Sequence, residues 1–159
     1  MTTKQNKTEM TRRRFIGASA VATFGFQVVP SRVFGANSRL AVAGIGSGGK
    51  GRADITGAAK AGADIVALCD VDESRADAMF KTHAKAKRFA DFRVMLEKMG
   101  KSIDACTIST PDHTHAAATS MAMKMGKHCY TQKPLTHDVY EARYLTRLAK
   151  RTGVVTQMG

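Results

Sequence analysis

The chain of 159 residues has no tryptophan and only three cysteines, which are Cys69, Cys106 and Cys129. The odd number excludes a framework in which every cysteine is paired, and the absence of CxxC spacing argues against a zinc site. Each cysteine lies inside or beside an apolar run that we interpret as a strand. We therefore expect three buried thiols and no metal centre.

A long hydrophobic run is also missing, because the most apolar stretch, residues 15–30, is short and interrupted by small residues. We therefore expect no stable membrane span. The stretch follows the segment TRRRFIG at residues 11–17, which resembles a twin-arginine export signal with Arg12 and Arg13 as the pair and Phe15 and Ile16 as the apolar positions. A cleavage site around residues 33–36 would make residues 1–36 a signal peptide and send the protein to the periplasm or another extracytoplasmic compartment. An amphipathic or disordered basic N-terminus is the alternative.

Acidic residues are scarce, with 13 against 25 lysines and arginines, and the formal net charge is +12. Six of the basic residues and one of the acidic residues precede residue 37. Over residues 37–159, basic residues therefore outnumber acidic residues by seven. That excess is scattered over predicted helix faces, without a basic stripe and without interleaved aromatic residues. The charge therefore indicates a solvated surface, and we expect no nucleic-acid partner.

From residue 39 onward, short β-rich apolar runs alternate with longer helical ones, a pattern typical of βαβ units. It predicts a Rossmann-type α/β fold over residues 37–159, with a parallel sheet and helices on both faces. In the last helix, Val139, Ala142, Leu145, Leu148 and Ala149 recur on one face, which should pack against the sheet. The strands are expected at 40–45, 64–69, 88–90, 103–109, 127–131 and 154–157, and the helices from the glycine cluster to 61, then at 73–84, 92–99, 113–125 and 139–150.

A glycine cluster, GIGSGG at residues 44–49, follows the first strand and opens a helix. We interpret Gly44, Gly46 and Gly49 as a GxGxxG fingerprint, with Ile45 inside it. Gly44 would allow the tight turn, Gly46 would let the backbone approach a pyrophosphate, and Gly49 would let helix and strand pack closely.

The acidic residue that should accompany this loop is Asp70, at the end of the second strand, where it can accept hydrogen bonds from the adenosine ribose. Its charge would repel a 2′-phosphate, so NAD is favoured over NADP, although Arg75 could soften that preference. A methyltransferase would also bind an adenosine ribose with an acid at this position, and the glycines alone leave that reading open.

Two later segments follow strands: STPDHTH at residues 109–115 and TQKPLTHD at residues 131–138. Together with the glycine loop and VALCDVD at 66–72, they resemble the Gfo/Idh/MocA family of oxidoreductases, including exported members similar to glucose-fructose oxidoreductase. The resemblance covers essentially all of residues 39–159. It implies an NAD(P)-dependent oxidoreductase that acts on a sugar or polyol-like substrate, with this chain as the nucleotide-binding domain.

The resemblance also implies roles for individual residues. Lys133 would be the catalytic residue, a proton-transfer or orienting group beside the nicotinamide, and Pro134 could be a cis proline. Gln132 stands where the family usually has a glutamate, so it can hydrogen-bond a ribose but brings no charge. Thr110, Pro111 and His115 would line the nicotinamide side. His113 and His115 have no third partner for a metal, and we interpret them as a capping and packing pair.

Members of this family carry a second α/β domain that binds substrate, and the sequence stops at Gly159, just after the last predicted strand. We therefore hypothesise that the chain is a truncated product or a fragment that folds and holds NAD but does not turn over substrate alone. A non-catalytic dinucleotide-binding module is the alternative function. Association into a homo-oligomer stays open.

Overall fold

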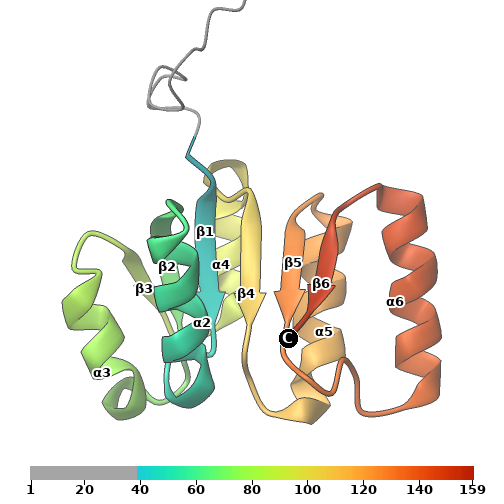
Figure 1. Ribbon diagram of the computed structural model, residues 1–159, viewed down its shortest axis with the longest axis horizontal. Helices are drawn as coiled ribbons and strands as arrows, with labels where there is room; N and C mark the ends of the chain where they lie inside the picture. Colours follow the sequence, from blue (N-terminus) through green and yellow to red (C-terminus); the bar gives the residue numbers. More distant parts are fainter. Residues whose placement is uncertain (1–38) are drawn as a thin grey trace, which may run out of the picture. The chain divides into compact units, whose positions relative to one another are not determined.

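The computed structural model describes residues 39–159, and the predicted signal peptide lies outside the described residues. Six parallel strands form one sheet in the order β3-β2-β1-β4-β5-β6 (Figure 1). The Rossmann-type α/β fold predicted from the alternating pattern is therefore confirmed. The strands are β1 (Ala41–Ile45), β2 (Asp64–Cys69), β3 (Lys87–Phe89), β4 (Ala105–Ile108), β5 (His128–Thr131) and β6 (Thr156–Met158).

The connections between the strands are helical, and their bounds lie within a few residues of those predicted. They are α2 (Gly49–Lys60), α3 (Glu73–Thr82), α4 (Phe92–Met99) with a short 3₁₀ turn η2 (Gly100–Ser102), α5 (Asp112–Lys124) and α6 (Val139–Thr152). None of these described helices is both long and apolar enough to cross a membrane.

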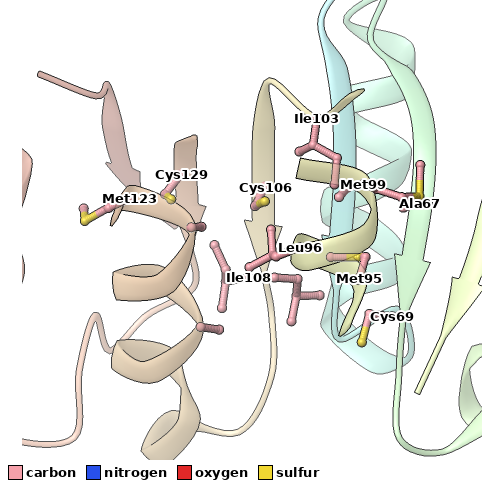
Figure 2. Packing of buried hydrophobic residues seen from close by; sticks show 14 of the residues in the cluster. Ala67, Cys69, Met95, Leu96, Met99, Ile103, Cys106, Ile108, Met123 and Cys129 are labelled. Carbon is pink, nitrogen blue, oxygen red and sulfur yellow. The ribbon is translucent and has the colours of Figure 1, made fainter. Parts of the chain in front are cut away.

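Both faces of the sheet bury side chains, because successive residues of a strand point to opposite sides. In β2, Ala67 and Cys69 join the larger core with α4, α5 and α6, whereas Leu68 joins a smaller core with α2 and α3. Figure 2 shows part of the larger core, in which Met95 and Leu96 of α4 pack among strand side chains. Helices α4, α5 and α6 thus cover one face of the sheet, whereas α2 and α3 cover only the β1 to β4 part of the other face.

The three cysteines are buried and free, as predicted. Burial raises the pKa of Cys69 to about 12, with a smaller contribution from the negative charges of Asp70 and Asp91. Burial likewise raises the pKa of Cys129 to about 12 and also raises that of Cys106. The thiols therefore belong to the core and are poor nucleophiles at neutral pH.

Helix α6 differs in one respect from its predicted packing. Leu145 and Leu148 are buried against the sheet, but Val139 is 65% exposed. Val139 lies in the first turn of α6, which extends past the carboxyl edge of β5 and β6 and so has no strand to pack against (Figure 1). The sequence period identifies the face of a helix correctly but not where the neighbouring sheet ends.

Candidate nucleotide-binding site

The strand order reverses between β1 and β4. The chain goes from β1 outward to β2 and β3, and then returns to β4 on the other side of β1. In an open parallel sheet, the loops after two such strands diverge and leave a crevice at the carboxyl edge. A cleft of about 620 Å³ lies at this point, and the loops after β1, β2 and β4 line it. Of the residues predicted to form the site, Ile45, Gly46, Gly49, Asp70, Thr110 and Pro111 line this cleft.

The glycine loop has its three special positions two residues later than predicted. Gly44 lies inside β1, where a Cβ atom would come 2.5 Å from Cδ1 of Ile55. The tight turn is at Gly46, which has a φ of 80° and whose Cβ would lie 2.7 Å from the backbone of Ser109. The close approach of helix and strand occurs at Gly51, because a Cβ there would overlap the carbonyl oxygen of Gly46.

Gly49 therefore does not have the packing role assigned to it, since only the guanidinium of Arg75 lies near its added Cβ. The fingerprint geometry belongs to Gly46, Gly48 and Gly51, which satisfy the same GxGxxG spacing in the same run. The two registers differ only in where the strand ends. That end is fixed by the pairing of Ile45 with Cys69 and Ile108 on either side.

Asp70 holds the glycine loop against the end of β2. One carboxylate oxygen accepts hydrogen bonds from the backbone N–H groups of Ser47 at 2.8 Å and Gly48 at 2.9 Å, and the other accepts from Asp72 at 3.0 Å. Arg75 lines the same part of the cleft and packs against Gly48. An acid and a guanidinium thus face the same end of the cleft.

The start of α2 is built differently from the starts of α3, α4 and α6. Those three helices begin at Asp72, Asp91 and Asp138, whose carboxylates accept hydrogen bonds from the first-turn amides. Helix α2 begins at Gly48 without a side-chain cap. Its first-turn N–H groups, together with the positive end of the helix dipole, can therefore receive a negatively charged ligand group. The residues at this edge fit a dinucleotide pyrophosphate.

The segment after β4 forms the opposite wall of the cleft, but His115 does not line it. His115 is only 1% exposed, and its ring nitrogens lie 2.7 Å from the carbonyl oxygens of Thr110 and Pro134. His115 thus links the segment after β4 to the segment after β5 without lining the cleft. Its predicted packing role is confirmed. Helix α5 has Pro111 at its N-cap and no side-chain cap, so the capping role predicted for the histidine pair is wrong.

His113 is exposed and lines the cleft. Within residues 39–159, no group of three or more His, Cys, Asp or Glu side chains is placed to hold a metal ion.

The segment after β5 contains a cis peptide bond between Lys133 and Pro134, as the sequence suggested. Lys133 is exposed and lies outside the lining of the cleft. Gln132 is buried at 7% exposure, and its side-chain amide donates to Asp54 at 3.3 Å instead of facing the cleft. In this structure, neither residue projects into the space that would hold the dinucleotide.

Asp54 is the residue that sequence reasoning missed. Its side chain is 4% exposed and accepts hydrogen bonds from Ser109 Oγ at 2.7 Å and from Lys50 Nζ. The hydrogen bond to Asp54, helped by the charge of that carboxylate, raises the pKa of Lys50. The only signal in the sequence is a lysine and an aspartate four residues apart in a helix, a spacing that usually marks an exposed pair.

Comparison with known proteins agrees with this geometry. Residues 38–159 match the family model described as the oxidoreductase family with an NAD-binding Rossmann fold, named GFO_IDH_MocA. The chain is 33% identical over 121 residues to scyllo-inositol 2-dehydrogenase (NAD(+)) of Bacillus subtilis, covering 76% of this chain and 35% of that protein. It is 29% identical over 92 residues to D-glucoside 3-dehydrogenase of Escherichia coli, covering 58% of this chain and 26% of that protein.

Among solved structures, UDP-N-acetylglucosamine 3-dehydrogenase from Acidithiobacillus ferrooxidans aligns with a TM-score of 0.66 at 29% identity, covering 76% of this chain and 38% of that one. The fold and cleft define a dinucleotide-binding Rossmann domain. The family match extends over most of the chain, so the protein belongs to the Gfo/Idh/MocA oxidoreductase family. The matches cover 18% to 35% of the length of the curated relatives.

Substitution of Gly51 tests the register of the glycine loop. Gly51→Ala places a methyl group against the Gly46 carbonyl, and we expect the free energy of unfolding to fall by about 2–3 kcal/mol. Gly57→Ala is the matched control in the same helix, where an added Cβ meets nothing within 4 Å. It should raise the free energy of unfolding by up to about 1 kcal/mol, since alanine favours a helix more than glycine does. Urea unfolding followed by circular dichroism measures both. Equal stability of the two variants would contradict the assigned register.

Proposed function

We propose that the cleft between the ends of β1, β2 and β4 binds NAD, and that the chain supplies the nucleotide-binding part of an oxidoreductase. The observation that carries the proposal is the uncapped start of α2 beside Asp70, at the point where the strand order reverses. The family match supports the same cofactor.

The pyrophosphate would rest on the amides of the glycine loop and of the first turn of α2. Asp70 would accept the adenosine ribose hydroxyls once its carboxylate shares or exchanges the bonds that it now receives from Ser47 and Gly48. A fixed carboxylate there repels a 2′-phosphate, which favours NAD. Arg75 provides a positive charge at the same end, so NADP binds more weakly but is not rejected outright.

The nicotinamide would lie toward Thr110 and Pro111 on the opposite wall of the cleft. When bound, the cofactor accepts or donates the hydride. Lys133 follows β5 at the same edge of the sheet, and we propose that it orients the substrate hydroxyl or moves its proton. A lysine suits this task if substrate and cofactor together remove it from water, because desolvation lowers the pKa of an ammonium group.

The substrate class follows from the relatives. The names of the relatives describe dehydrogenases of an inositol, a glucoside and a nucleotide sugar. These substrates share a secondary hydroxyl on a ring that carries several hydroxyls, so we propose a sugar or polyol-like substrate for the complete protein.

Cofactor titration tests the nucleotide site. NADH should bind at least about tenfold more tightly than NADPH, and Asp70→Asn should weaken NADH binding by about tenfold because one charge-assisted hydrogen bond is lost. Calorimetry is the appropriate measurement, since the chain has no tryptophan. Asp64→Asn, at the opposite end of β2, is the control and should leave affinity unchanged. A folded chain that binds neither nucleotide would contradict the proposed site.

Lys133 distinguishes an oxidoreductase from the alternative, a non-catalytic dinucleotide-binding module. The position of Lys133 outside the lining of the cleft is the observation that favours the module. In a polypeptide completed by a substrate domain, Lys133→Ala should lower the rate of NAD reduction by about 100-fold or more, since proton transfer is lost. NADH affinity should change by less than about twofold, because the lysine lies outside the cleft. Lys101→Ala, an exposed lysine at the other edge of the sheet, is the control. Unchanged rates in both variants would favour the module.

We further propose that residues 1–36 direct export by the twin-arginine route, which carries folded proteins and so suits a chain that acquires its cofactor before export. The support is the sequence of residues 11–17 alone. The final location would be periplasmic or otherwise extracytoplasmic.

Replacement of the arginine pair tests this export. Arg12→Lys together with Arg13→Lys should leave a tagged chain in the cytoplasm of a host that has the twin-arginine pathway, whereas Arg14→Lys should not. Cell fractionation followed by immunoblotting measures the distribution. Equal export of both variants would rule out twin-arginine recognition.

A further inference from the structure

A single buried carboxylate joins the three segments that form the proposed site. Asp54 lies in α2, one turn after Lys50, and its side chain is 4% exposed. One oxygen accepts from Ser109 Oγ at 2.7 Å, at the end of β4, directly before the wall formed by Thr110. The other accepts from Lys50 Nζ and from the Gln132 amide at 3.3 Å, directly before Lys133. Helix α2 and the segments that follow β4 and β5 therefore meet at Asp54.

Gln132 is held in this arrangement from several sides. Its Nε2 atom also lies 3.4 Å from the hydroxyl of Tyr130, and the backbone of Gly159 passes so close that an added Cβ would overlap the amide. The Gly159 N–H donates to the carbonyl of Thr131 at 2.8 Å, which fixes that strand end in place. The Gln132 amide is therefore buried between Asp54, Tyr130 and the end of β6.

The contact with Asp54 suits an amide at position 132. A glutamate there would place a second carboxylate within contact of Asp54, with the Lys50 ammonium as the single cation hydrogen-bonded to the pair. Two buried carboxylates that share one cation repel each other, which destabilises the contact. A glutamine instead donates a hydrogen bond to the existing acid. At this contact the negative charge is therefore that of Asp54 in α2.

We propose that Asp54 is a positioning residue for the proposed site. Through Gln132 and Ser109 it sets the segments that contain Lys133 and Thr110 relative to the glycine loop. The consequence for catalysis rests on the proposed function, whereas the exchange of charge between positions 54 and 132 can be tested without it.

The test exchanges the acid and the amide in the full chain. Asp54→Asn and Gln132→Glu are made singly and together, so that the double variant restores one carboxylate and one amide at the same contact. Asp77→Asn is the control, because Asp77 forms an ion pair with Lys81 at the same four-residue spacing but on the exposed face of α3. Three quantities are measured for each protein: the equilibrium constant for urea unfolding, the backbone amide NMR shifts of Lys133 and Thr110, and the affinity for NADH.

Each single variant should raise the unfolding constant, and Gln132→Glu should do so by about tenfold or more near neutral pH, because two carboxylates then compete for Lys50. Acidification should relieve part of that loss, since the second carboxylate raises the pKa of the introduced glutamate and protonation removes the repulsion. The double variant should recover most of the loss of either single variant. The Lys133 and Thr110 shifts should move in the single variants and return in the double variant. Asp77→Asn should change neither these shifts nor the recovery of stability.

Additive effects, with no recovery in the double variant, would overturn the proposal and leave Asp54 as an ordinary buried acid. If Gln132→Glu does not fold, the comparison of Asp54→Asn with the double variant still decides, because only a direct pairing of one acid with one amide predicts that the second substitution repairs the first. Recovery of stability and of the Lys133 shifts without NADH binding in any variant would uphold the positioning role and contradict the proposed function. NADH binding without recovery of stability or of the shifts in the double variant would support the proposed function and contradict the positioning role.

Discussion

The contact between Gly51 of α2 and the carbonyl of Gly46 sets the geometry of the whole carboxyl edge. Because neither residue has a side chain, the first turn of α2 can lie directly against the turn that ends β1. The free amides at the start of the helix then face the cleft, and Asp54, one turn further along the helix, reaches the ends of β4 and β5. A helix displaced by even one methyl group would lose both relationships.

The loops at this edge are connected mainly through polar side chains. Asp70 binds the glycine loop to β2, His115 bridges the segments after β4 and β5, and Asp54 joins those same segments to α2. Such bonds are directional, so they fix positions more sharply than apolar contacts, which tolerate sliding. The hydrophobic cores above and below the sheet make the domain stable, while these polar links determine the form of the site.

Much of the fold follows from local chemistry. The alternation of apolar runs predicts strands and helices, and the aspartates before three of the helices accept hydrogen bonds from first-turn amides. The cysteines are buried because they belong to the core that α4, α5 and α6 form with the sheet. The sequence-based predictions fail where a local pattern fits two structures equally well or does not indicate the contact at all. The glycine run fits GxGxxG in two registers, and the lysine–aspartate pair of α2 resembles an ordinary surface pair.

The sequence by itself therefore determined the class of fold, the order of its elements, the acid that follows β2 and the family to which the chain is similar. These features depend on residues close together in the chain, or on motifs whose order is preserved in the sequence. Only the tertiary structure decided which glycines form the turn, that Gln132 faces an aspartate and that His115 lies behind the cleft. Each of these depends on strand pairing or on contacts between residues far apart in the chain, which no local pattern contains.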